Sequence, residues 1–390
     1  MTTLGTVDDL HETASARTGL DDFGDPAYRE AMQVLMDSYV HDAGLTEAGT
    51  VRTRAMLETV LETKLRLRQA YTRRPKAADL AIRRPIFVTG LPRTGTTALH
   101  RLLCLDPAHQ GLEHWLTEAP QPRPPKSSWA GHPDHRRMQE ALEVLHEANP
   151  TLRGMHFMSA DMVEECWRAE RLSMRSIAFQ NTAHLPGYSE WLAARDMAPA
   201  YEAHRDMLRI IGLNDRDRRW VLKSPSHLFG LDALMATYPD ALVIATHRHP
   251  RTIVASVSSL NRNASAGTST LFTADVVGRD CLDLWARGAQ AFLEARQRYD
   301  SAQFIDVHYE DFVADAPGIV EAIYQQFDLP LSQDVRDAVA ASHEQSKAGE
   351  RRPVHHYSLS DFGLTESEVD ARFADYVNEH LGPRAHPRAG

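Results

Sequence analysis

The residues best suited to chemistry follow a short apolar stretch, Ile86 to Val88, and end where a helical pattern begins. From Thr89 to Thr97 the chain reads Thr-Gly-Leu-Pro-Arg-Thr-Gly-Thr-Thr. The two glycines of this run permit positive φ values, so successive backbone N–H groups can point inward at the N-terminus of the following helix. The helix dipole adds partial positive charge at the same place. The sequence therefore predicts a loop that binds a phosphate or sulfate group through Arg93, Thr94, Gly95, Thr96 and Thr97.

This loop differs at one position from the loop that binds nucleoside triphosphates. Thr96 stands where that loop has its lysine, and Arg93 supplies a cation from inside the loop instead. Without the lysine, the β- and γ-phosphates of ATP lose their usual partner. A planar guanidinium suits a 5′-phosphosulfate better. A small-molecule kinase with an atypical phosphate loop is the alternative interpretation.

A second anion site is predicted where another apolar stretch, residues 241–246, ends. Arg248 follows this stretch, and Ser256 lies eight residues later on a predicted helix. Pro250 suits the first turn of that helix. An arginine at the carboxyl edge of a strand and a serine on the next helix could close on one phosphate from two directions.

The two motifs, in this order, resemble those of the sulfotransferases that use 3′-phosphoadenosine 5′-phosphosulfate (PAPS), in particular a bacterial branch with a GLPRTGTT-type loop. The resemblance spans residues 85–377. It implies that the first loop binds the 5′-phosphosulfate and that Arg248 and Ser256 bind the 3′-phosphate. It also implies that Lys223 is the central lysine of the family and that Tyr309 contacts adenine. A basic segment with Arg351 and Arg352 loosely resembles a late loop that covers the 3′-phosphate, and surface charge is its alternative interpretation.

Sulfuryl transfer is an in-line displacement in which negative charge builds on the leaving phosphate oxygen, so fixed cations nearby give most of the acceleration. Arg93 and Lys223 are predicted for that role, and the scheme requires no metal. The acceptor hydroxyl also needs a general base. Glu113 is the first candidate, because it resembles in position the glutamate base of the tyrosylprotein sulfotransferases. His114 and His227 are the alternatives, the latter because the cytosolic branch uses a histidine shortly after its lysine.

The elements that position these residues alternate between strands and helices. Strands are expected near 85–89, 220–223, 241–246 and 303–308, which requires right-handed crossovers and a parallel sheet. We therefore expect an α/β fold of the P-loop-like sulfotransferase type, with an N-terminal helical extension at 1–80 and the main domain at 81–390. A helical insertion at about 120–215 would build the acceptor pocket. Helical patterns are expected at 26–43, 46–71, 97–105, 134–148, 159–172, 187–211, 252–260, 272–298, 315–327 and 332–346.

Composition narrows the class of protein further. The net charge of −10 over 390 residues argues against a nucleic-acid partner. The resemblance to sulfotransferases implies that the acceptor is a hydroxyl of a small molecule, lipid or glycan. No apolar run reaches the length of a membrane span, and the N-terminus does not resemble a signal peptide. An odd count of three cysteines suits a reducing compartment, so we expect a cytoplasmic protein. An apolar stripe in 46–71 would pack on the core or on a second subunit, which leaves a homodimer open. A nucleotide-binding protein without catalysis is the third interpretation of the chain.

Overall fold

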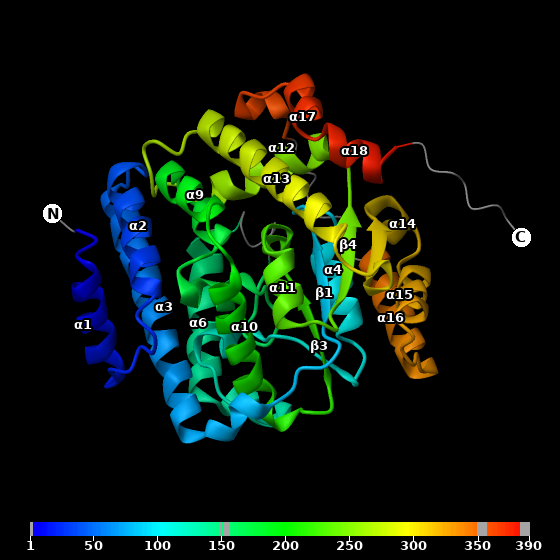
Figure 1. Ribbon diagram of the computed structural model, residues 1–390, viewed down its shortest axis with the longest axis horizontal. Coiled ribbons are helices and arrows are strands. Elements are labelled where there is room, and N and C mark those ends of the chain that lie inside the picture. The colour runs from blue at the N-terminus through cyan, green and yellow to red at the C-terminus, as the bar shows by residue number, and fades with distance from the viewer. Residues whose placement is uncertain (1–2, 149, 151–156, 349–356, 383–390) are drawn as a thin grey trace, which may run out of the picture.

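A five-stranded parallel sheet forms the centre of the computed structural model, which describes residues 3–148, 150, 157–348 and 357–382 (Figure 1). The strand order is β2-β3-β1-β4-β5, so β1, which precedes the predicted anion-binding loop, is central. The predicted parallel α/β fold is confirmed, and each of the four expected strands begins within one residue of its predicted start. The strands are β1 (Ile86–Gly90), β2 (His109–Gln110), β3 (Arg219–Lys223), β4 (Leu242–His247) and β5 (Phe304–His308).

Helices cover both faces of this sheet, as a parallel sheet requires. Because side chains alternate along a strand, Ile86 and Val88 face the helices α4, α14, α15 and α16, whereas Phe87 faces the opposite side. There Phe87 packs against His204 of α10 and Tyr238 at the end of α11. The apolar run that predicted β1 is therefore buried on both faces. In Figure 1 the helices α1–α3 lie on one side of the molecule and α14–α16 on the other.

The helices agree with most of the expected patterns, and the exceptions are treated below. None of the described helices combines the length and the apolar character that a membrane crossing requires. The α-helices are α1 (Val7–Thr18), α2 (Tyr28–His41), α3 (Glu47–Arg73), α4 (Thr96–Leu103), α5 (His114–Glu118), α6 (Pro133–Ala148), α8 (Trp167–Glu170), α9 (Pro186–Ala193), α10 (Ala198–Ile211), α11 (Leu231–Thr237), α12 (Pro250–Ala264), α13 (Ala274–Arg296), α14 (Tyr309–Ala314), α15 (Ala316–Gln326), α16 (Gln333–Ala348), α17 (Glu366–Arg372) and α18 (Ala374–His380).

The helix predicted over 159–172 is wrong for most of its length. Only α8 and a following 3₁₀ turn are helical, and the part before them is a non-helical segment in which Val163 forms an isolated antiparallel bridge with Glu113. Its backbone bonds to distant parts of the chain: the N–H of Glu164 donates to the carbonyl of Leu112 (2.8 Å), and that of Cys166 to the carbonyl of Lys223 at the end of β3 (3.0 Å). Pairing with backbone far away in sequence therefore overrides the helical pattern.

The helix predicted over 187–211 is two helices, α9 and α10. They are separated at residues 194–197, where the Asp196 carboxylate accepts a hydrogen bond from the backbone N–H of Ala198 (2.9 Å). Pro199 occupies the first turn of α10, a position that favours a new helix start. The apolar stripe of α3 packs on the core of the same chain, which is one of the two arrangements expected from the sequence. Leu57 and Leu61 of this stripe are fully buried.

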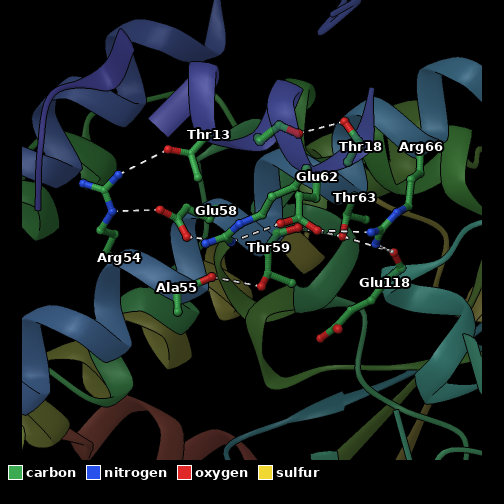
Figure 2. Close-up of polar contacts among 12 residues, drawn as sticks. Thr13, Thr18, Arg54, Ala55, Glu58, Thr59, Glu62, Thr63, Arg66 and Glu118 are labelled. Carbon is green, nitrogen blue, oxygen red and sulfur yellow. Dashed lines mark hydrogen bonds and ion pairs between the residues drawn. The ribbon is translucent and has the colours of Figure 1, made fainter. Parts of the chain in front are cut away.

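A row of ion pairs fixes α1 along α3 (Figure 2). Glu58 of α3 accepts from Arg54 Nε (2.8 Å) and pairs with Arg17 of α1 (2.7 Å). Glu62 pairs with Arg17 (3.3 Å) and with Arg66 (3.1 Å), and Arg66 also donates to the backbone carbonyl of Glu118 (3.2 Å). The Glu58 side chain is only 4% exposed, so its two charge-assisted bonds lie largely out of water.

Replacing Glu58 with alanine is expected to reduce stability. The substitution removes a buried carboxylate that two guanidinium groups share, and hydrogen bonds to charged groups contribute about 1.5–3 kcal/mol. We expect the free energy of unfolding, measured by urea titration, to fall by about that amount. Glu12→Ala, at an exposed position of α1, is the control and should change it by less than about 0.5 kcal/mol. Equal losses in both variants would show that the ion-pair row does not hold α1.

Candidate active site

Positive φ values curl the loop between β1 and α4 around the N-terminus of that helix. Gly90, Arg93 and Gly95 have φ of 142°, 67° and 86°, and Gly95 caps α4 in the left-handed conformation. The Thr94 hydroxyl donates to the carbonyl of Leu91 (2.7 Å) and lies 2.5 Å from the hydroxyl of Thr246 on β4. The side chain of Thr94 therefore fixes the shape of the loop and ties it to the neighbouring strand.

Gly90→Ala should disrupt this loop. A Cβ at Gly90 would lie 2.4 Å from the backbone oxygen of Thr246 and 2.4 Å from its hydroxyl, and the φ of this residue is one that L-residues rarely adopt. We expect a loss of about 3 kcal/mol or more in unfolding free energy. Gly131→Ala is the matched control, because a Cβ there meets nothing within 4 Å. Similar melting temperatures for the two variants would contradict the close approach of β1 and β4.

The two predicted anion sites adjoin each other at the carboxyl edge of the sheet. Arg93 Nε donates to the Ser256 hydroxyl (3.2 Å), and Arg248 Nη1 donates to the backbone carbonyl of Arg93 (3.0 Å). The Arg248 guanidinium also lies 4.0 Å from the centre of the Tyr309 ring. Tyr357 donates to the Ser256 hydroxyl (2.8 Å), a contact that sequence reasoning missed. Arg351 and Arg352, predicted to cover the 3′-phosphate, lie outside the described residues.

Arg93 and Arg248 differ from the nearby Arg251 in the charge of the groups that surround them. Arg251 pairs with Glu366 and Asp370 of α17. Among the described residues, no carboxylate lies within ion-pair distance of Arg93 or Arg248, whose partners are a hydroxyl, a carbonyl and an aromatic ring. Two guanidinium groups without a counterion, beside a helix N-terminus, are typical of a site that binds an anion.

Lys223 ends β3 next to the same loop. Its side chain is 2% exposed, and its ammonium donates to the Thr97 hydroxyl (3.1 Å) in the first turn of α4. It also forms an ion pair with Glu165, on the non-helical segment that precedes α8. The structure thus brings together Lys223 and the loop as predicted. A buried ammonium needs a carboxylate partner, but the sequence offers 53 acidic residues and no signal that singles out Glu165.

Glu113, the first candidate for the general base, forms its ion pair with an arginine. Glu113 is buried and accepts from Arg123 Nε (2.9 Å), and Arg123 also pairs with Asp215 (2.7 Å). Burial raises the pKa of the Glu113 carboxyl above its usual value, and Arg123 opposes that shift. Glu113 and Arg123 line a cavity of about 460 Å³ together with Cys104, which follows the far end of α4, and none of residues 91–97 lines it. His114 follows Glu113 and is 1% exposed. Both remain predictions as the base.

His227 lies in a polar cluster beneath the sheet. Its Nδ1 is 2.8 Å from the hydroxyl of Tyr201 and 3.6 Å from Glu170. Burial holds the pKa of His227 well below its usual value, and burial raises the pKa of Glu170 to about 7. The His227 ring packs edge-on against Phe87, on the face of the sheet opposite α4. These contacts favour a structural role for His227.

Among the described residues, one group of possible metal ligands comes from β4, β5 and α18. Ligand atoms of His247, Asp306 and His380 come within 4.8 Å of one another. The Asp306 carboxylate already accepts from both Nη atoms of Arg296 (2.6 and 2.7 Å) and contacts His247 Nε2 (2.7 Å). Because the guanidinium of Arg296 balances the carboxylate charge, an ion pair with this arginine and a hydrogen bond with His247 account for the position of Asp306 without a metal.

Comparison with known proteins finds similarity to sulfotransferases over most of the chain. Residues 85–333 match the model of a family described as the sulfotransferase family. Two curated relatives, the omega-hydroxy-beta-dihydromenaquinone-9 sulfotransferases Stf3 of Mycobacterium bovis and Mycobacterium tuberculosis, are each 27% identical to this chain over 255 residues. That match covers 63% of this chain and 63% of the length of each relative.

Two solved structures are similar over nearly the whole chain. The sulfotransferase STF1 from Mycobacterium tuberculosis is 48% identical, with a TM-score of 0.89 over 96% of this chain and 100% of that one. The sulfotransferase STF9 from Mycobacterium avium is 25% identical, with a TM-score of 0.87 over 97% of each chain. The similarity therefore includes the helices α1–α3 as well as the sheet.

Proposed function

The chain belongs to the sulfotransferase family, and from this premise we propose that it transfers a sulfuryl group from PAPS to a hydroxyl of a small-molecule, lipid or glycan acceptor. One observation carries the proposal. Arg93 and Arg248 lie next to each other, and neither has a carboxylate counterion among the described residues. Lys223 contacts the first turn of α4, the helix that follows the loop containing Arg93. A ligand with anionic groups at two positions, such as an adenosine 3′,5′-bisphosphate, would fit these cations.

We assign the parts of the donor to the residues that suit them. The 5′-phosphosulfate would bind Arg93, the backbone of the loop and the N-terminus of α4. The 3′-phosphate would bind Arg248 and Ser256, and the adenine would lie near Tyr309. Arg93 contacts Ser256 directly, so it would link the two anionic groups. Tyr357, which already donates to Ser256, would adjust when the 3′-phosphate binds.

The chemistry follows from this placement. The acceptor oxygen forms a bond to sulfur while the bond from sulfur to the bridging phosphate oxygen breaks, and the leaving bisphosphate takes the electron pair. Lys223 and the first backbone N–H groups of α4 would stabilise the charge that develops on the leaving oxygen. The acceptor proton passes to a base, and no step requires a metal.

The nature of the acceptor is proposed from a relative. Stf3 is named for an omega-hydroxylated dihydromenaquinone, which is a lipid-like molecule with a hydroxyl group. We therefore propose that the acceptor is an apolar molecule that carries a hydroxyl group. Phenols and glycans are the less favoured acceptor classes.

The proposal is tested by donor consumption. The purified chain is mixed with ³⁵S-labelled PAPS and, in separate reactions, with a polyprenyl alcohol, a phenol and an alkyl glucoside. We expect release of adenosine 3′,5′-bisphosphate and transfer of the label to at least one acceptor, without added metal. Phosphorylation of an acceptor by magnesium-ATP, with no release of bisphosphate from PAPS, would favour a kinase instead.

A further inference from the structure

The backbone holds Glu165 beside the reactive edge of the sheet. The residues on either side of it are fixed, since the N–H of Glu164 donates to Leu112 and that of Cys166 donates to the carbonyl of Lys223. The two neighbouring carboxylates have different partners: the Glu164 side chain pairs with Arg168, whereas Glu165 forms its ion pair with Lys223.

Among the carboxylates of this region, Glu165 is both partly exposed to solvent and in contact with Lys223. Its side chain is 18% exposed, compared with 2% for Lys223. Glu164 is 7% exposed and bound to Arg168, Glu113 is bound to Arg123, and Glu170 is 1% exposed. The Glu165 carboxylate is therefore accessible to a small molecule that approaches Lys223.

The same ion pair has a second consequence. The Lys223 ammonium contacts the Thr97 hydroxyl and Glu165 together, so a donor anion at the loop would compete with Glu165 for this ammonium. Binding of the donor would weaken the hold of Lys223 on the carboxylate. A carboxylate released from its counterion, within reach of the sulfate, is suited to accept a proton.

From these contacts we propose that Glu165 is the general base of the transfer, an assignment that rests on the proposed function. As the acceptor oxygen attacks sulfur, its proton passes to the Glu165 carboxylate. The sulfur–oxygen bond to the phosphate breaks, and the electron pair remains on the leaving bisphosphate near Lys223. The protonated Glu165 then returns the proton to water and pairs again with Lys223 after the products leave.

Glu165→Gln tests this role because it should move two quantities in opposite directions. Removal of a negative charge that competes for Lys223 should tighten binding of adenosine 3′,5′-bisphosphate by about tenfold. Loss of the base should lower turnover by about 10²-fold or more. Turnover is measured as bisphosphate release from PAPS with the best acceptor of the panel, or with water as the acceptor. Affinity is measured by calorimetry.

Three further variants sharpen the test. Asp161→Asn removes an exposed carboxylate from the same segment and should leave turnover and affinity within threefold of the wild type. Glu165→Asp keeps the carboxylate and should recover part of the lost turnover. Glu113→Gln tests the base that the sequence favoured. Melting temperatures confirm that each variant is folded.

Slow turnover with tighter bisphosphate binding in Glu165→Gln supports the assignment. Turnover within threefold of the wild type would overturn it, and so would a parallel loss of affinity and turnover, which indicates a structural role. A loss of turnover in Glu113→Gln alone, with affinity retained, would move the base to Glu113. If the wild type itself neither binds the bisphosphate nor releases it from PAPS, the proposed function fails, which is a different result.

Discussion

Lys223→Met is expected to lower kcat by about 10²- to 10³-fold while the chain remains folded. The ammonium is 2% exposed and contacts the first turn of α4, where the leaving oxygen of the donor would lie. In such a site, loss of one group that stabilises developing charge has an effect of this size. Methionine has a similar length, so it fills the space of the lysine side chain without its charge.

The measurement compares kcat with the affinity for adenosine 3′,5′-bisphosphate. Because we propose that Lys223 stabilises the transition state more than the bound donor, kcat should fall much further than affinity. Lys76→Met makes the same substitution at an exposed position and should leave both quantities unchanged. A kcat within tenfold of the wild type in Lys223→Met would remove this lysine from the mechanism.

Arg248→Ala is expected to weaken bisphosphate binding by about 10²-fold. Its guanidinium has no carboxylate partner among the described residues, so its charge is available to the 3′-phosphate. A charge-assisted hydrogen bond contributes about 1.5–3 kcal/mol, which corresponds to roughly 10- to 10²-fold in affinity. Turnover at saturating donor should change little, since the 3′-phosphate lies away from the reacting sulfur.

Arg251→Ala is the matched control for this prediction. Arg251 lies three residues further along the chain but pairs with Glu366 and Asp370. Its removal should leave bisphosphate affinity within threefold of the wild type. Equal affinity in Arg248→Ala and the wild type would show that the second anion site has been misinterpreted.

The sheet and the loop were predictable because their signals are local. A short apolar run marks each of β1, β3, β4 and β5, and glycine spacing marks the turn into α4. Residues that follow these runs, such as Lys223 and Arg248, therefore fell at the carboxyl edge of the sheet. The helix α1 also carried a readable signal that sequence reasoning missed, a capping box formed by Thr6 and Asp9.

The identity of the partners could not be predicted in the same way. No local sequence pattern distinguishes Glu113 from Glu165, yet Glu113 pairs with Arg123 and Glu165 pairs with Lys223. Their difference comes from the segment before α8, which is held outside a helix by hydrogen bonds to the backbone of Leu112 and Lys223. Such contacts depend on the assembled sheet rather than on a local pattern. The division of the chain near residue 80, a cytoplasmic location and a homodimer remain predictions from the sequence.

The most direct measurement is a calorimetric titration of the purified, metal-free chain with adenosine 3′,5′-bisphosphate, with magnesium-ATP as the competing ligand. We expect the bisphosphate to bind tightly without metal and magnesium-ATP not to displace it, because we propose that Arg93 and Arg248 bind two separate phosphate groups and because Thr96 replaces the lysine that ATP requires. Preferential binding of magnesium-ATP, with weak or no binding of the bisphosphate, would contradict a PAPS-dependent sulfotransferase and favour a kinase.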